Sequence, residues 1–131
     1  PLYSSAASDV YKRQGYTGDA IVAVDFYRTR TDWAAEWLFS SLRTEEAREP
    51  EQFRKNQEQF IHPTVLTVHQ PLQAVALPGL DSLEYTILQY DDDPLNHIYL
   101  GRRGNQVFRL LCRDVPGQAE CLELFLAQLD P

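Results

Sequence analysis

The hydrophobic residues of this chain follow a strand-like pattern in some segments and a helical period in others, and the changes between them mark the predicted elements. Residues 20–27 are apolar at almost every position, which is typical of a β-strand covered on two faces, or on one face and by an edge loop. Asp25 is the one interruption of this run. The sequence therefore predicts a β-strand here with little exposed surface.

The next segment has a helical period. Thr31 or Asp32 is suited to cap a helix, because a short polar side chain accepts a hydrogen bond from the first free N–H groups. After this cap, four large apolar residues recur at helical spacing while acidic residues fall off their stripe. We interpret the stripe as the buried face of an amphipathic helix: Trp33, Trp37, Leu38 and Leu42.

Pro50 predicts the start of a second, shorter helix, because proline is favoured in the first turn, where its missing N–H costs no hydrogen bond. Only Phe53, Gln57 and Phe60 lie on one side of the polar stretch that follows. We expect this second helix to pack only lightly.

From residue 64 onward the pattern changes to five short β-strands separated by turn-forming residues. Gly104 or Asn105 tolerates the positive φ of a tight turn, so the last two strands should form a hairpin. A helix with proline in its first turn then ends the chain. The predicted strands span residues 64–69, 72–77, 83–90, 96–101 and 106–112, and the last helix spans residues 116–129 with Ala119, Leu122, Phe125, Leu126 and Leu129 as its buried stripe.

The predicted order is therefore a strand, one or two helices, five strands and a helix. Consecutive strands that are joined by short turns pair antiparallel, and helices then cover one or both faces of the sheet. The predicted fold class is α+β: an antiparallel sheet of about five to six strands covered by helices, an α/β sandwich that forms a single domain from residue 15 to residue 131.

Residues 1–14 do not fit this domain. Residues 4–14 read Ser-Ser-Ala-Ala-Ser-Asp-Val-Tyr-Lys-Arg-Gln, which is identical to the translation of a transposase-based sequencing adapter ending in its mosaic end. The three residues before them resemble a sample barcode in the same reading frame. The segment thus resembles an artefact of an unassembled metagenomic read, and we expect it to be disordered; a natural leader rich in Ser and Ala is the alternative.

On this interpretation the natural protein is truncated at its N-terminus and starts no earlier than Gly15. A signal peptide or lipid-attachment cysteine would lie upstream, so the lack of a targeting signal carries no information about the compartment.

Charge narrows the partner classes. The chain has a net charge of −7, which becomes −8 when Lys12, Arg13 and Asp9 are left out. Binding to nucleic acid needs a clustered basic surface, whereas the basic residues of the domain occur at most in pairs. We therefore expect no nucleic-acid partner and no anionic membrane surface. No apolar run is long enough to span a bilayer.

Cys112 and Cys121 are the most informative pair of residues in the domain. Cys112 ends a predicted strand on the same face as Phe108 and Leu110, and Cys121 lies on the inner side of the last helix, four residues before Phe125. Side chains so placed can reach bonding distance. A disulfide closing about ten residues would contribute roughly 2.5 to 3 kcal/mol. The alternative is two reduced core thiols in a cytosolic protein.

Metal sites are disfavoured. His62 and His69 are an odd number of residues apart, so on one strand they would point to opposite faces. The run from Asp91 to Asp93, with His97 nearby, lacks the alternating pattern of a calcium loop and is typical of a solvated acidic turn. The cysteine spacing is not that of a zinc site, and no glycine-rich phosphate loop is present, so we expect no cofactor.

Catalysis has little support. No serine, cysteine or threonine stands in a nucleophile elbow or beside an identifiable base. Asp25 and Glu84 interrupt apolar strands and are candidates for a carboxylate pair with raised pKa values, although edge or solvent-facing positions explain them more simply.

The domain also contains a set of aromatic residues that can line a ligand pocket between helix and sheet. Aromatic residues at such spacings are more often core, but common exposure would indicate a partner surface. The candidate binding surface is Trp33, Trp37, Tyr85, Tyr90 and Tyr99, with Phe108 as a further member of the aromatic set.

The C-terminal half resembles PsbP-like α/β-sandwich domains and small bacterial lipoproteins. The resemblance rests on residues 97–100, 103–110 and the terminal helix through Leu129, and covers about a quarter of the chain. It implies a strand, a Gly-Asn hairpin, an apolar strand and a closing helix, sometimes with cysteines around the final loop. Such domains are typically non-catalytic binding or assembly modules, and no functional residue is carried over.

Three functions stay open. The first is a non-catalytic extracytoplasmic binding or assembly module, periplasmic or lipoprotein-like, with an unidentified protein or small-ligand partner. The second is a cytosolic, acidic adaptor similar to a secretion chaperone. The third is an enzyme of unknown type that uses Asp25 and Glu84 or the cluster from Asp91 to Asp93.

Overall fold

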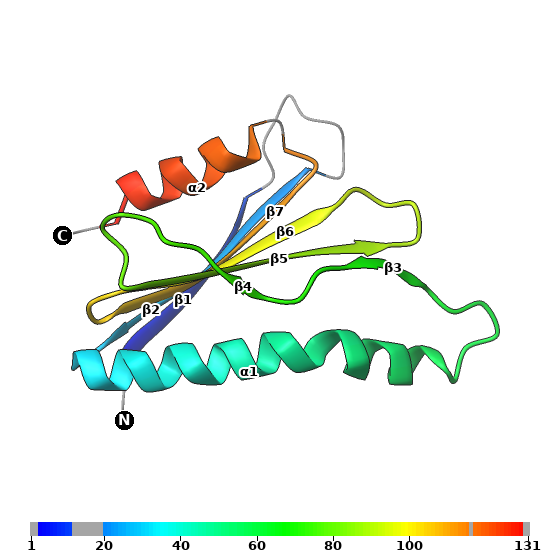
Figure 1. Cartoon of the computed structure of the whole chain (residues 1–131), viewed down its shortest axis with the longest axis horizontal. Coiled ribbons are helices and arrows are strands. Elements are labelled where there is room, and N and C mark those ends of the chain that lie inside the picture. The colour runs from blue at the N-terminus through cyan, green and yellow to red at the C-terminus, as the bar shows by residue number, and fades with distance from the viewer. Residues whose placement is uncertain (1–2, 12–19, 116, 130–131) are drawn as a thin grey trace.

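From residue 20 onward the predicted order of helices and strands is confirmed (Figure 1). The computed structural model describes residues 3–11, 20–115 and 117–129. The elements are β1 (Tyr3–Tyr11), β2 (Ile21–Thr29), α1 (Asp32–Gln57), β3 (Leu66–His69), β4 (Gln73–Ala74), β5 (Ser82–Tyr90), β6 (Asn96–Arg103), β7 (Gln106–Arg113) and α2 (Gln118–Ala127).

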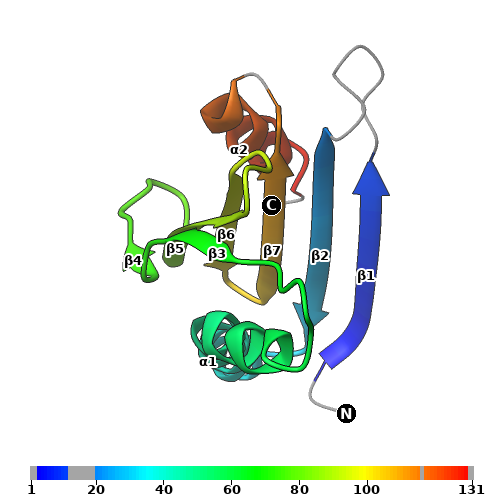
Figure 2. The same ribbon diagram turned by 90° about the vertical axis from the view of Figure 1, so that its right-hand side faces the viewer.

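The sheet is antiparallel throughout, so the α+β class is confirmed. Among the described residues its strand order is β1-β2-β7-β6-β5-β3, with β4 also paired to β5. The six strands from β2 to β7 match the predicted number. Strand β1 lies at the outer edge of the sheet beside β2 (Figure 2).

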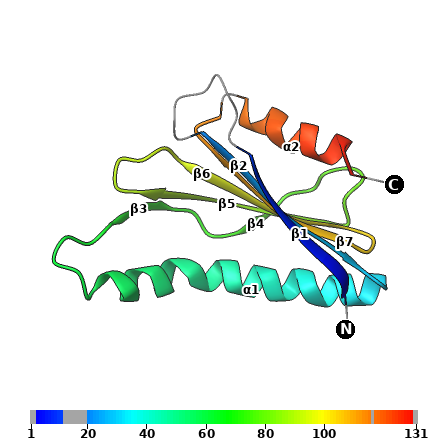
Figure 3. The same cartoon turned by 180° about the vertical axis from the view of Figure 1, so that it is seen from behind.

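The two helices lie on opposite faces of the sheet (Figures 1 and 3). Strand β7 shows why its sequence is apolar at both parities: Phe108 and Leu110 pack in the core beneath α2, whereas Val107 packs in the core beneath α1. All three side chains are fully buried. The strand is thus covered on both faces, which a continuous apolar run predicts.

Helix α1 begins as predicted, with the Thr31 hydroxyl accepting a hydrogen bond of 3.0 Å from the Ala34 N–H. The predicted second helix is wrong, because α1 continues without a break through Pro50. Proline removes one helical hydrogen bond. Here Pro50 is buried and lines a small cavity with Leu72 and His69, so tertiary packing favours the continuous helix.

The predicted buried stripe of α1 is wrong for both tryptophans. Trp33 is 66% exposed and Trp37 is 49% exposed, whereas Leu38 is buried. Small residues explain the rotation of the helix, because Ala34 and Ala35 allow close approach to the sheet where a tryptophan would hold it away. The buried face of the N-terminal half is Ala34, Ala35, Leu38 and Phe39.

Residues 3–11 form strand β1, so the disorder expected for this segment is wrong for these nine residues. They pair antiparallel with β2 from Tyr3 opposite Thr29 to Tyr11 opposite Val22. The outer edge of a strand presents unpaired main-chain groups, which any extended segment can satisfy. Because these hydrogen bonds are made by the main chain, the pairing does not depend on whether the segment is natural, and its adapter origin stays a prediction. Residues 1, 2 and 12–14 of this segment lie outside the described part.

Smaller differences concern the C-terminal half. Strand β4 has two residues instead of the six predicted, since Pro71 and Pro78 flank this segment and proline cannot donate to a ladder. Ala119 is exposed instead of buried, whereas Cys121 and Leu122 are buried. In the described part of the chain, no helix combines the length and apolar character that crossing a membrane requires.

Candidate functional site

A cleft lies between the second half of α1 and the sheet. Its volume is about 400 Å³, which lies within the range of small-ligand sites. Four strands and one helix contribute to it, so residues far apart in sequence meet there. The described side chains that line it are Asp25, Tyr27, Leu42, Glu45, Glu46, Glu49, Leu88, Tyr90, Asn96, Ile98, Arg109 and Leu111.

An ion pair forms the base of this cleft. The Nε of Arg109 on β7 donates to Oε1 of Glu46 on α1 over 2.6 Å. The Glu46 side chain is 6% exposed and that of Arg109 is 30% exposed. Burial alone lowers the pKa of Arg109, but the hydrogen bond to Glu46 and the charges of Glu46, Asp25 and Glu49 outweigh burial and raise it. The guanidinium therefore stays charged.

Acidic and aromatic side chains line the rest of the cleft. Glu45 and Glu49 lie one helical turn apart on α1, and both are exposed. Tyr90 faces them from the end of β5. Burial, followed by the negative charges of Glu49 and Glu46, raises the pKa of the Tyr90 hydroxyl against an opposing effect of Arg109. The cleft is thus a region of negative potential.

Asp25 and Glu84 do not form the carboxylate pair considered from the sequence. Both side chains lie on the face of the sheet that α1 covers. However, Asp25 is on β2 and Glu84 is on β5, and the strands β7 and β6 lie between these two. Three strand spacings separate the two residues by about 14 Å. Glu84 instead accepts a 3.2 Å hydrogen bond from Arg43 of α1, and only Asp25 lines the cleft.

The acidic turn has a structural role. Asp91 has a φ of 51° and its side chain accepts a 2.9 Å hydrogen bond from the Val65 N–H. The Thr67 hydroxyl donates to the Asp91 carbonyl over 2.8 Å. These hydrogen bonds connect β3 and the residue before it to the turn that follows β5. Within the described residues, no group of three or more His, Cys, Asp or Glu side chains is placed to hold a metal ion.

The five aromatic residues of the predicted binding surface lie in three different places. Trp33 and Trp37 lie on the outer side of α1, and Tyr90 lines the cleft. Tyr85 and Tyr99 stack on the α2 side of the sheet with ring centroids 4.8 Å apart. The structure therefore does not bring the five together.

His97 extends the tyrosine stack on the α2 side. Its ring is nearly parallel to that of Tyr85, and the Tyr85 hydroxyl lies 2.6 Å from Nδ1 of His97. Burial lowers the pKa of His97. A neutral imidazole suits this contact, because its unprotonated nitrogen can accept the tyrosine proton.

The two cysteines meet between β7 and α2, as their positions predict. Their Sγ atoms lie 2.8 Å apart, and both residues are buried. The hydrogen bond with Cys121, reinforced by burial, raises the pKa of the Cys112 thiol. The pair joins the last strand to the last helix and closes the core on that face.

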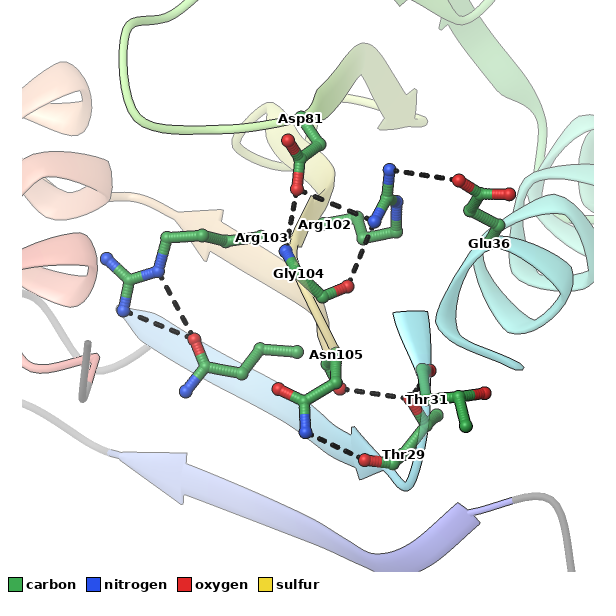
Figure 4. Close-up of polar contacts among 9 residues, drawn as sticks. Thr29, Thr31, Glu36, Asp81, Arg102, Arg103, Gly104 and Asn105 are labelled. Atoms are coloured by element: carbon green, nitrogen blue, oxygen red, sulfur yellow. Dashed lines mark hydrogen bonds and ion pairs between the residues drawn. The ribbon is translucent and has the colours of Figure 1, made fainter. Parts of the chain in front are cut away.

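A polar network fixes the start of α1 to the turn between β6 and β7 (Figure 4). Arg102 contacts Glu36 at 3.6 Å and Asp81 at 3.5 Å, which ties the helix and the segment before β5 to one strand. Asn105 donates to the Thr29 carbonyl over 2.8 Å. The network holds the N-terminal half of α1 close to the sheet, while the cleft lies beneath its second half.

Comparison with known proteins gives no family for the chain. Neither a scan against protein-family models nor a search of curated proteins found a match.

Sequence reasoning missed most of the cleft. Only Asp25 and Tyr90 were singled out, whereas Glu46, Glu49 and Arg109 were not. The expectation that the acidic residues of this helix lie off its buried stripe is wrong for Glu46, which follows Leu38 and Leu42 at intervals of four residues and is buried. A charged residue at a buried helical position needs a partner of opposite charge, and Arg109, in an otherwise apolar strand, is such a partner.

Proposed function

We propose that this chain is a non-catalytic, extracytoplasmic binding module and that the cleft between α1 and the sheet is its binding site. The cleft carries the proposal, because it combines a ligand-sized volume with charged, aromatic and apolar side chains from five elements. The base of the cleft favours recognition over proton transfer. A general acid or base must change its protonation near the working pH, whereas Arg109, paired with Glu46, stays charged.

The cysteine pair supports the extracytoplasmic part of the proposal. Two buried thiols whose sulfur atoms lie 2.8 Å apart are placed to be linked by an oxidising compartment. We expect protein secreted to a bacterial periplasm to show no free thiol when it is denatured and treated with iodoacetamide. Two alkylated cysteines in that sample would contradict the proposal that the chain is extracytoplasmic. The same protein made in a reducing cytosol is the control.

The binding part of the proposal is tested with three small probes of different charge. Agmatine, glutarate and phenol are titrated into the ¹⁵N-labelled chain, and amide shifts are followed by NMR. We expect at least one probe to shift the amides of Asp25, Glu46 and Arg109 in a saturable manner. If no probe shifts these amides, the cleft is not the binding site.

The adaptor hypothesis keeps one specific observation in its favour. Trp33 and Trp37 expose their rings one turn apart on the outer side of α1. Aromatic patches of this kind mark contact surfaces, and a secretion-chaperone-like adaptor would use one to dimerise. Light scattering of the purified chain measures whether it is a monomer or a dimer. The test variant is W33S/W37S, and the control is Leu124→Ser, which replaces an exposed leucine of α2. A dimer that only the tryptophan variant disrupts would favour the adaptor.

A further inference from the structure

The charge of the cleft points to the chemical class of its ligand, on the basis of the binding function proposed above. Four carboxylates line the cleft, whereas Arg109 is the one basic side chain among its described lining residues. Glu46 already neutralises Arg109 through their hydrogen bond. Glu45 and Glu49 therefore supply the carboxylate charge that is left to face a ligand.

Two of these carboxylates stand in an arrangement that is unfavourable without a ligand. Glu45 and Glu49 are four residues apart on α1, and like charges at this spacing destabilise a helix by a few tenths of a kcal/mol. Both line the cleft, and neither makes an ion pair or side-chain hydrogen bond within the described part of the chain. A cation held between them would remove this repulsion.

Aromatic rings complete the arrangement. Tyr27 and Tyr90 line the same cleft from β2 and β5. The ring of Tyr90 packs against Phe53 of α1 with centroids 4.7 Å apart, which restricts its orientation. A positive group over a tyrosine face is attracted by the ring quadrupole, and the attraction grows when water is partly excluded.

We propose that the cleft binds an organic cation, namely an ammonium or guanidinium group that lies between Glu45 and Glu49 and against the ring of Tyr90. The apolar residues Leu88 and Leu111 line the same cleft and suit the hydrocarbon part of such a ligand. The group belongs either to a free small molecule or to a lysine or arginine side chain of a peptide. Both sources share the recognised chemistry.

The test compares probes of both sources with a charge-matched pair of variants. Agmatine and a terminally blocked arginine peptide are titrated by calorimetry into the full chain, and glutarate is the anionic control. In E45Q/E49Q two of the four cleft carboxylates are neutralised and the Arg109–Glu46 pair is kept. In E51Q/E58Q two acidic residues of the same helical region outside the cleft lining are neutralised.

We expect at least one cationic probe to bind saturably and glutarate not to bind. E45Q/E49Q should weaken this binding by about tenfold, whereas E51Q/E58Q should change it by less than about twofold. Binding should also weaken at high salt, since the contacts are partly exposed. Tighter binding of agmatine than of the peptide identifies a free small molecule as the source, and the reverse identifies a side chain.

Three outcomes overturn the inference. They are the absence of binding by both cationic probes, equal weakening in the two double variants, and preferential binding of glutarate. Cleft shifts with glutarate or phenol alone would leave the cleft as a binding site and refute only the cationic ligand, so the two proposals fail separately. Circular dichroism of each variant confirms that it is folded.

Discussion

Gly101 shows how one residue without a side chain shapes the core. It lies directly opposite Phe108 across the β6–β7 pair, and a Cβ at this position would overlap the Phe108 ring. Phe108 is fully buried, so the ring has little room to move. The glycine is therefore required for close packing of an aromatic side chain, and not for an unusual backbone angle.

Substitution of Gly101 by alanine should lower the free energy of unfolding by about 1 to 3 kcal/mol, because the added methyl group overpacks the core. Chemical denaturation monitored by circular dichroism measures the loss. The double variant G101A/F108L tests the cause, since a smaller residue at position 108 should relieve the overlap. If the two single effects simply add, the overlap does not explain the loss.

His97 predicts a pH-dependent part of the stability. Its pKa is lowered by burial in the folded chain, whereas the unfolded chain has the ordinary value near 6.5. The unfolded state therefore binds more protons once the pH falls below about 6.5, and stability decreases until the pH is below the folded pKa. Above about pH 7 the contribution is constant.

Denaturation midpoints at pH 7 and pH 5 check this prediction. We expect His97→Phe, which keeps a ring in the stack with Tyr85, to lose less stability between the two pH values than the parent chain. His62→Gln is the control, because His62 is exposed. Equal pH dependence in the parent chain and His97→Phe would assign the effect to other groups.

At the scale of elements, the sequence predicts existence and order better than orientation. The run of apolar residues that becomes β2 and the turn at Gly104 are local signals, and both elements form where expected. The rotation of α1 is not local. Trp33 and Trp37 have the bulk of core residues, but the helix turns Ala34 and Ala35, together with Leu38 and Phe39, toward the sheet.

Helix α2 depends on its link to β7. It is 10 residues long, and isolated helices of this length are marginal in water. Its packing onto the sheet includes the contact between Cys112 and Cys121. A disulfide at this contact would stabilise the helix by restricting the unfolded chain.

We therefore expect oxidised protein to lose about 2 to 3 kcal/mol of unfolding free energy when dithiothreitol is added or when Cys121 is replaced by serine. Urea denaturation with and without the reductant measures both losses. The variant Cys121→Ser should not respond to the reductant. Identical midpoints of the parent chain in both buffers would show that the two thiols are not linked.

At the scale of the molecule, the cleft follows from how α1 crosses the sheet. Contacts of Arg102 with Glu36 and Asp81 hold the first half of the helix against the strands, and Leu38 and Phe39 fill the space beneath it. Farther along, Glu46 reaches the sheet through its hydrogen bond with Arg109, and the cleft opens beside this pair, with Glu45 and Glu49 among its lining residues. The sequence pattern does not predict the gap between the second half of α1 and the sheet, because the gap depends on side chains from five elements.

The edge strand β1 is the part of the fold whose contribution to stability depends on the origin of residues 1–14. Strand β1 pairs with β2 alone, and α1 and α2 pack on strands farther inside the sheet. If residues 1–14 derive from a sequencing adapter, no selection has fitted their side chains to the domain. Their pairing would then rest on main-chain hydrogen bonds, whose net contribution is small because water competes for the same groups.

Deletion of residues 1–14 should therefore leave the Tm within about 2 °C of the parent value, since a loss of 1 kcal/mol would move the Tm of a domain of this size by about 4 °C. Differential scanning calorimetry measures the change. Replacement of residues 3–11 by a Gly-Ser linker of equal length is the matched control, because it removes the side chains and keeps the chain length. A fall of several degrees in both variants would show that the segment is an integral strand. An unchanged Tm, together with fast exchange of the β2 amides that face β1, would instead leave β2 as the effective edge of the domain.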